Sequence, residues 1–391
     1  MEKSVILGAA RTPIGAFLGG LAPMKAPQLG AIAIACAIER SGVAPDRIDE
    51  VFMGSVLQAG VGQAPARQAA LGAGLPRSVP CTTINKVCGS GLKAVMLAAS
   101  QIAAGEYGVI VAGGMESMSN APYLLRGLRQ GLTLGEHSME DANLTDGLVD
   151  AYGGGHMGLG GEKAAAKSSL TRADQDRFAL RSYEKALAAQ RTGAFTAEIV
   201  PVDVPGRKGQ VSRIEKDESP RETTLEALAA LKPAFMPDGT VTAGNASKLN
   251  DGAAALVMAG ETHARELGAT PLARIVAQAQ FAHEPDLFLL APSGAIARVL
   301  EKAGWSVRDV DLYEVNEAFS GIEAVRRELG IAEDRFNVNG GAVALGHPIG
   351  ASGARLLVTL LYALRARGTR RGVVSLCLGG GEAVALAVEA L

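Results

Sequence analysis

The sequence is poor in the features that mark several common classes of protein. Aromatic residues make up 4% of the 391 residues, and the formal net charge is −2. This balance offers no broad basic surface for nucleic acid or for an anionic membrane. No apolar run approaches about 18 residues, so no helix is expected to span a membrane. We therefore predict that the chain binds neither nucleic acid nor membrane.

Cysteine is also scarce, and its spacing excludes further classes of site. The four cysteines form no Cys-x-x-Cys pair, which argues against zinc and against a thioredoxin-type centre. The N-terminal segment MEKSVILGAARTP has no long apolar region and no small-residue cleavage site, which argues against secretion. We predict a cytoplasmic protein with free thiols and no metal.

An internal repeat organises what is present. The segment AIACAIERSGVAPDRIDEVFMG, from Ala33, matches AIARVLEKAGWSVRDVDLYEVN, from Ala295, at an offset of 262 residues (295 − 33). The same offset carries Ser90-Gly91 onto Ser352-Gly353 without a gap. Two matches in one register indicate a duplicated unit. Each copy alternates helix and strand patterns, which is typical of an α/β fold.

A charged, turn-rich stretch interrupts the first copy at about 120–248. It contains one strong helix pattern, in which Thr171 can cap the N-terminus and Asp174 and Asp176 lie in the first turn. The segment GRKGQ predicts a hairpin turn. We interpret the stretch as an inserted lobe that covers a site built by the two copies.

Cys88, in NKVCGSGLKA, follows a strand pattern and precedes a helix pattern. A thiol at a helix N-terminus has a lowered pKa, which favours a nucleophile. Cysteine is more often a small buried hydrophobe, so the position alone does not decide its role. His347 lies in the corresponding turn of the second copy, in GHPIGASGAR. Equivalent turns of a duplication tend to face each other, and imidazole is the usual partner of a reactive cysteine.

Two further strand ends carry candidate groups. Cys377 precedes the triple-glycine loop of LCLGGG, whose backbone N–H groups could stabilise an oxyanion, although the loop could equally be a plain turn with a packed cysteine. Asn316, in YEVNEAFS, could orient a water or simply cap the next helix.

At this point the sequence resembles the thiolase family of acyl-CoA C-acyltransferases. The resemblance covers the whole chain and rests on NKVCGSGLKA, GNASKLNDGAAAL, VNEAF, GGAVALGHPIGASGAR and LCLGGG, in the family's order. It implies a duplicated five-layer α/β/α/β/α fold with an inserted loop domain. It also implies an N-terminal domain at 1–268, with the loop domain at about 120–248, a C-terminal domain at 269–391, and a homo-oligomer built as a dimer of dimers.

The resemblance also implies roles for individual residues. Cys88 would be the acylated nucleophile, His347 its activator, and Cys377 the group that exchanges a proton with the substrate α-carbon. Asn316 would hold a water beside the enolate oxygen, and the N–H groups of Cys88 and Gly379 would form a second oxyanion hole. Acyl-CoA thioesters would be the substrates, with no further cofactor. The residues expected to contact them are Ser247, Arg221, His156, Met157, Ala318 and Phe319. The segment His156–Gly158 resembles that of the short-chain, biosynthetic type, in which it borders the acyl pocket.

The sequence departs from the family pattern at three places. Lys248 stands where glycine is common, and either contacts the coenzyme or points outward. Glu382-Ala383 and the segment 289–296 also differ, which leaves the preferred acyl length open. Three other functions are alternatives. A decarboxylating ketosynthase typically uses a cysteine with two histidines, whereas this sequence offers Asn316 and Cys377. A cysteine hydrolase would leave Cys377 without a task, and a non-enzymatic acyl carrier would need neither of the two cysteines.

Overall fold

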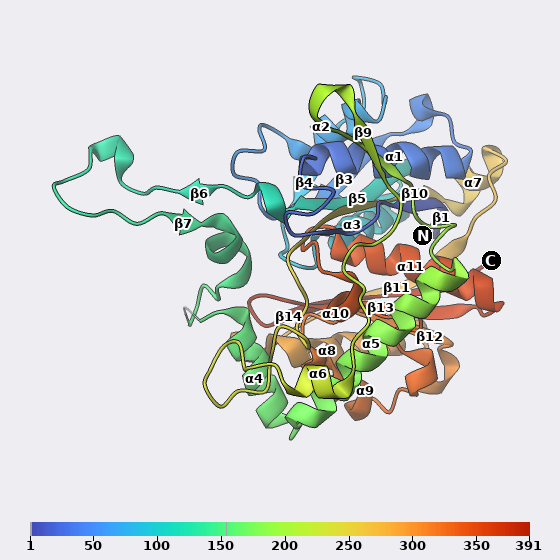
Figure 1. Cartoon of the computed structure of the whole chain (residues 1–391). Coiled ribbons are helices and arrows are strands. Elements are labelled where there is room, and N and C mark those ends of the chain that lie inside the picture. The colour runs from blue at the N-terminus through green and yellow to red at the C-terminus, as the bar shows by residue number, and fades with distance from the viewer. Residues whose placement is uncertain (1, 154) are drawn as a thin grey trace.

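The two copies of the repeated unit fold alike in the computed structural model, which describes residues 2–153 and 155–391 (Figure 1). The offset of 262 residues relates β3 to β12, α3 to α11 and β5 to β13. The duplication predicted from the sequence is thus present in the structure. The first copy contains β1 (Ser4–Arg11), β2 (Gly15–Ala16), α1 (Ala26–Ser41), β3 (Glu50–Gly54), α2 (Pro65–Gly72), β4 (Cys81–Ile84), α3 (Ser90–Ala104), β5 (Val109–Ser117) and β10 (Asn250–Gly260). After α7 (Glu261–Glu266), the second contains β11 (Ala273–Ala282), α8 (Ala291–Ala303), β12 (Leu312–Val315), α9 (Glu323–Glu328), α10 (Ala342–Leu345), α11 (Ser352–Arg367), β13 (Arg371–Leu378) and β14 (Glu382–Ala390).

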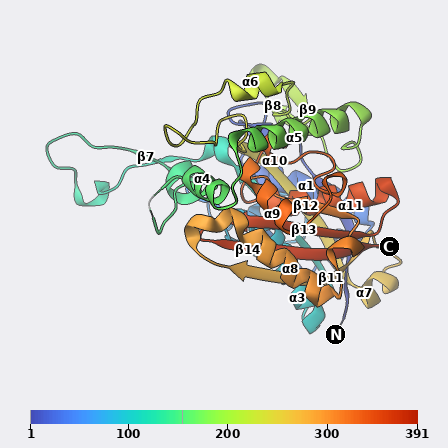
Figure 2. The same cartoon turned by 90° about the horizontal axis from the view of Figure 1, so that it is seen from below.

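A ten-stranded sheet runs through both copies. Its order is β12-β13-β14-β11-β1-β10-β5-β3-β4, with β2 paired to β10. β1 and β11 are joined through only two residue pairs, Val5–Arg274 and Ile6–Ala273. The sheet therefore divides at this junction into one half from each copy, and the strands of the second half lie side by side in Figure 2.

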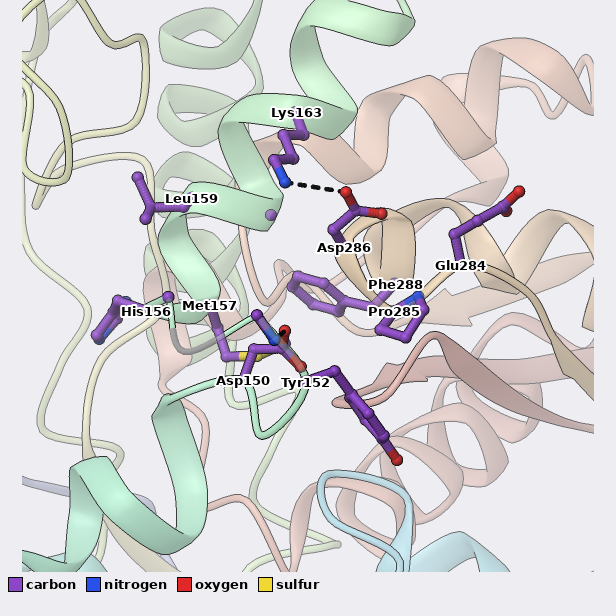
Figure 3. A pocket seen from close by; sticks show the side chains of 13 residues that line it. Asp150, Tyr152, His156, Met157, Leu159, Lys163, Glu284, Pro285, Asp286 and Phe288 are labelled. Carbon is purple, nitrogen blue, oxygen red and sulfur yellow. Dashed lines mark hydrogen bonds and ion pairs between the residues drawn. The ribbon is translucent and has the colours of Figure 1, made fainter.

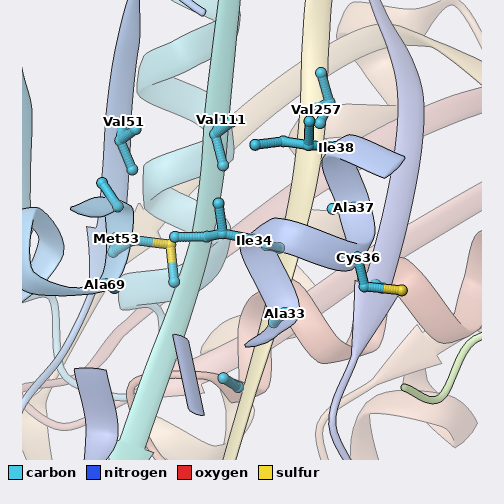
Figure 4. Packing of buried hydrophobic residues seen from close by; sticks show 14 of the residues in the cluster. Ala33, Ile34, Cys36, Ala37, Ile38, Val51, Met53, Ala69, Val111 and Val257 are labelled. Carbon is cyan, nitrogen blue, oxygen red and sulfur yellow. The ribbon is translucent and has the colours of Figure 1, made fainter. Parts of the chain in front are cut away.

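Helices cover both faces of each half of the sheet. In Figure 4, Ile34 and Ile38 of α1 pack against Val51, Val111 and Val257 of the first half. Helix α8 covers the outer face of the second half of the sheet. Between the two halves lies an inner layer in which α3 packs on α11. These layers form the α/β/α/β/α arrangement that the family resemblance implied.

Glycine lets the two inner helices approach closely. A Cβ atom on Gly353 of α11 would lie 2.5 Å from the backbone nitrogen of Leu92. A Cβ atom on Gly91 of α3 would lie 2.9 Å from the backbone nitrogen of Ala354. These two glycines occupy equivalent positions of the repeat, so a side chain at either one would push the two copies apart.

The inserted stretch forms a lobe and an extended arm. Its helices and strands are β6 (Tyr123–Leu124), β7 (Glu140–Asp141), the π-helix η4 (Asn143–Leu148), α4 (Met157–Lys167), α5 (Arg172–Thr192), β8 (Val202–Pro205), β9 (Val211–Ile214) and α6 (Leu225–Ala229). Thr171 caps α5, because its side chain accepts a hydrogen bond from the Asp174 N–H, as predicted. The predicted GRKGQ turn joins β8 to β9. The arm that carries β6 and β7 projects far from the body in Figure 1.

One expectation about hydrophobic runs was wrong. Within the described chain, the 18-residue window Val87–Ala104 is long and apolar enough to cross a membrane by length and composition. This window contains α3, and 56% of it is buried inside the protein. Its apolar character is explained by the inner layer, where α3 has sheet on two sides and α11 beside it.

Candidate active site

The Cys88 loop is a strained turn between β4 and α3. Val87 has a φ of 46°, an uncommon conformation for a β-branched residue. The Ser90 hydroxyl supports the turn, because it donates to the Val87 carbonyl (2.7 Å) and accepts from the Lys86 N–H (2.8 Å). Strain held in place by such contacts is typical of functional positions. The turn leaves the Cys88 side chain half-buried just before the first residue of α3.

The expected lowering of the Cys88 pKa was wrong. Burial raises the pKa of this thiol to about 12, because a thiolate loses its hydration there. The backbone N–H groups of Cys88 and Gly379 oppose the rise in pKa, since both donate toward the sulfur. Desolvation therefore outweighs these two backbone donors and favours the neutral thiol.

Gly379 belongs to the tight turn between β13 and β14. Leu378 pairs with Glu382 across this hairpin. Gly380 and Gly381 have φ values of 90° and 82°, which residues with a side chain rarely adopt. The turn places the Gly379 N–H beside the sulfur of Cys88, so two backbone donors from different copies converge on one point.

Cys377 lies at the end of β13 and is fully buried. Burial raises the pKa of its thiol well above the ordinary value, and a negative charge on Cys88 raises it further. The segments that carry the two cysteines are in contact, because a Cβ atom on Gly379 would lie 3.5 Å from the Val87 side chain. The structure thus brings together the two cysteines that the sequence singled out.

His347 is buried and held as a neutral base. The Ser352 hydroxyl donates to the Pro348 carbonyl (2.9 Å), so it accepts from the Nδ1–H of His347 (2.6 Å). This tautomer leaves the Nε2 lone pair free to accept a proton. Burial, aided by the charge of Arg355, lowers the pKa of the imidazole to about 3.

Asn316 faces the same nitrogen. Its side-chain Nδ2 lies 3.5 Å from His347 Nε2, and its backbone N–H donates to Ser375 of β13. Asn316 is fully buried, and its Oδ1 has no hydrogen-bond partner among the described residues. A buried amide oxygen without a protein partner is suited to hold a water molecule.

Two of the remaining candidate residues, His156 and Met157, lie at the start of α4. His156 caps α4 by accepting from the Gly158 N–H (3.0 Å), and its ring stacks on Phe235 at 4.6 Å. Burial lowers the pKa of His156, which favours its neutral form. Met157 lies next to Gly379, because a Cβ atom on Gly379 would lie 3.9 Å from the Met157 methyl carbon.

A cavity of about 500 Å³ adjoins the glycine turn. Met157, Phe288 and Tyr152 line it, and the Lys163–Asp286 ion pair (2.9 Å) borders it (Figure 3). Tyr152 also lies against Gly380, since a Cβ atom on that glycine would lie 3.5 Å from the tyrosine ring. The cavity therefore lies beside the turn that supplies the Gly379 N–H.

Ser247, Ala318 and Phe319 lie together in the structure. The Ser247 N–H donates to the Ala318 carbonyl (3.0 Å), and Ser247 is half-buried. The Phe319 ring lies edge-on to Phe235, with centroids 6.1 Å apart. Because Phe235 also stacks on His156, these residues form a continuous, mainly apolar surface.

Arg221 and Lys248 both lie on the aromatic ring of Tyr183. The Arg221 guanidinium is 5.8 Å and the Lys248 ammonium 5.0 Å from the centroid of Tyr183. Lys248 does not point outward, because its Nζ donates to the Tyr183 hydroxyl and the Val343 carbonyl, each at 2.8 Å. Burial, aided by the charge of Arg221, lowers the Lys248 pKa to about 8.

Comparison with known proteins decides the family. The family model described as "Thiolase, N-terminal domain" matches residues 4–262, and the one described as "Thiolase, C-terminal domain" matches residues 269–390. The chain belongs to the thiolase family. It is 52% identical to the acetyl-CoA acetyltransferase of Cupriavidus necator over the whole of both chains. It is 48% identical to the cytosolic acetyl-CoA acetyltransferase of Gibberella zeae, over 99% of this chain and 98% of the relative.

A solved structure confirms the thiolase fold. The crystal structure of the Bacillus anthracis acetyl-CoA acetyltransferase superposes with a TM-score of 0.98 at 44% identity. The alignment covers 100% of this chain and 99% of the other. The protein is thus a thiolase-family enzyme, and the ketosynthase, hydrolase and carrier hypotheses are set aside.

Two groups at this thiolase site were missed by sequence reasoning. Ser352, the partner of His347, could have been found from the repeat, since it is the equivalent of Ser90. Phe235 carries no local signal, because only the folded lobe brings it between His156 and Phe319. No group of three or more metal-ligating side chains occurs within residues 2–153 and 155–391.

Proposed function

We propose that this thiolase is an acetyl-CoA C-acetyltransferase. It joins two acetyl-CoA molecules reversibly to give acetoacetyl-CoA and CoA, and in reverse it cleaves 3-ketoacyl-CoA with CoA. The observation that carries this proposal is a second thiol, the fully buried Cys377, which lies two residues before the Gly379 whose N–H donates toward the Cys88 sulfur. One cysteine and one base would suffice for hydrolysis, whereas carbon–carbon bond formation also needs a group that removes an α-proton.

In the first half-reaction Cys88 becomes acetylated. Its thiol proton passes to Nε2 of His347 as the sulfur attacks the thioester carbonyl of acetyl-CoA. The developing oxyanion accepts from the N–H groups of Cys88 and Gly379. The carbon–sulfur bond to CoA then breaks, and Cys377 gives its proton to the departing sulfur. The products are acetyl-Cys88 and free CoA, with an imidazolium and a thiolate left in the site.

In the second half-reaction the Cys377 thiolate removes an α-proton from a second acetyl-CoA. The imidazolium of His347 and a water on Asn316 stabilise the enolate oxygen. The α-carbon attacks the acetyl carbonyl, and the carbon–sulfur bond to Cys88 breaks. Cys88 recovers its proton from His347, which restores the neutral site. Ser247, Arg221, His156, Met157, Ala318 and Phe319 bind the coenzyme A thioester, and no further cofactor or metal takes part.

The two cysteines give the proposal its test. Cys88→Ala should abolish transfer of acetyl from acetyl-CoA to the protein. Cys377→Ala should still be acetylated, but condensation should slow by about 10²–10⁴-fold, the usual contribution of an acid–base group. Intact-protein mass spectrometry reads the first effect and a condensation assay the second. Acetyl mapped by peptide digestion to Cys377, or to neither cysteine, would refute the assigned roles.

We also propose how the molecule is organised and where it acts. The domains are 1–268, with the loop domain at about 120–248, and 269–391. A homo-oligomer, as a dimer of dimers, is supported by the projecting arm, whose Leu134 and Met139 are largely exposed. We propose a cytoplasmic location without membrane or nucleic-acid partners. The name of the cytosolic Gibberella zeae relative supports that location.

A further inference from the structure

The two oxyanion donors come from loops that no strand pairing ties together. Cys88 belongs to the turn before α3, in the first copy, and Gly379 to the β13–β14 turn, in the second. The distance between their N–H groups therefore depends on side-chain contacts between the loops. Apolar packing supplies some of these contacts, since Gly89 fits against Leu378 and Val384.

One ion pair also bridges the two loops. The Lys86 ammonium bonds the Glu382 carboxylate. Lys86 lies two residues before Cys88, and Glu382 lies three residues after Gly379. The side chains are only 22% and 39% exposed, so solvent screens their attraction less than that of a fully exposed pair.

The surroundings make the carboxylate the essential member. Lys93, one turn into α3, feels the positive charge of Lys86 and the negative charge of Glu382. Without Glu382, two neighbouring lysines would repel each other with no carboxylate between them. Without Lys86, Glu382 could still attract Lys93. Loss of the carboxylate should therefore disturb the Cys88 loop more than loss of Lys86.

We propose that Lys86 and Glu382 are positioning residues that set the spacing of the two oxyanion N–H donors for acyl transfer. The proposal rests on the proposed function of Cys88 and Gly379. It gives a task to Glu382, one of the residues at which the chain departs from the common family pattern. A contact that acts on the transition state should change kcat more than KM.

The test is a charge-swap series with a matched control. Glu382→Gln should slow acetylation of Cys88 by about five- to tenfold, because a small displacement of an oxyanion donor costs part of the 10²–10³-fold effect of its removal. Lys86→Met should slow it less, and the double swap Lys86→Glu/Glu382→Lys should recover most of the wild-type rate. The KM for acetyl-CoA should change less than about twofold. Quenched-flow mass spectrometry measures the acetylation rate.

The control is Glu261→Gln, which breaks the Arg274–Glu261 pair of similar exposure, remote from the Cys88 loop. Cys88 of the Glu261→Gln variant should be acetylated at the wild-type rate. Wild-type acetylation should also slow in about 0.5 M sodium chloride, while that of Glu382→Gln should not slow, because this variant has no Lys86–Glu382 attraction for salt to weaken. The salt comparison uses only the wild type and Glu382→Gln, so it tests the ion pair independently of the double variant.

The outcomes separate this inference from the proposed function. Absence of acetyl-Cys88 in the wild type would refute the proposed function itself. If the wild type is acetylated and Glu382→Gln is acetylated at the same rate, the positioning role alone is overturned. So would a double swap as slow as the worse single variant, since that would show two independent effects and no pair.

Discussion

The hydrogen bond from His347 to Ser352 allows a quantitative prediction. In Ser352→Ala the Nδ1–H of His347 loses its 2.6 Å acceptor inside a buried site. An unsatisfied buried donor costs about 1–3 kcal/mol. The imidazole can avoid this cost by moving its proton to Nε2, where a water molecule can accept the hydrogen bond. The tautomer that can take the Cys88 proton then becomes the minor form.

The size of the effect follows from this cost. About 1.4–2.7 kcal/mol corresponds to a 10- to 100-fold loss of the reactive tautomer, and kcat/KM for acetoacetyl-CoA thiolysis should fall by about that factor. Stability should fall by about 1–3 kcal/mol in urea unfolding. Ser4→Ala is the control, because it removes another buried serine hydrogen bond, to Ala99 (3.2 Å), far from the site.

Ser4→Ala should lose stability while retaining kcat/KM. A Ser352→Ala enzyme with wild-type kcat/KM and reduced stability would refute the reasoning. Such a result would show that Ser352 serves the fold and does not select the tautomer of His347.

Three further predictions follow from the site and the arm. Acetoacetyl-CoA should be cleaved with higher kcat/KM than 3-ketohexadecanoyl-CoA, because His156 and Met157 resemble the short-chain type; the reverse order would contradict this. Alkylation of the resting enzyme at Cys88 by iodoacetamide should rise about tenfold per pH unit through pH 8–10, because a raised pKa keeps the thiolate fraction growing; a plateau near pH 7 would indicate a preformed thiolate. Light scattering at micromolar concentration should show an oligomer, and polar substitution of Leu134 and Met139 should lower its mass; a wild-type monomer would exclude the assembly.

The architecture was largely predictable because duplication leaves a register in the sequence. Matching Ser90-Gly91 with Ser352-Gly353 located the starts of both inner helices. Thr171 and the GRKGQ turn were predictable because capping and turn preferences are local. The sequence predicts less about the inner layer, because the apolar residues that α3 buries between the two halves of the sheet make it resemble a membrane segment.

The sequence singles out the proposed members of the candidate site but predicts little of their electrostatics. Cys88, His347 and Cys377 stand out by type and position, and the structure brings the two cysteines together. The pKa of Cys88 was predicted in the wrong direction, because the helix start is visible in the sequence and the desolvation is not. Lys248 was unpredictable for a similar reason, since its acceptors, Tyr183 and Val343, are 65 and 95 residues away.

The close approach at Gly91 and Gly353 has an evolutionary consequence. Each glycine makes room for the backbone of the other copy, so neither position serves its own half alone. After the duplication, the turns just before these glycines could diverge in chemistry, one acquiring a cysteine and the other a histidine. Gly91 and Gly353 themselves could not diverge in the same way, because a larger residue at either position would have displaced the inner helix of the other copy. Functional specialisation and structural symmetry thus coexist within a few residues of chain.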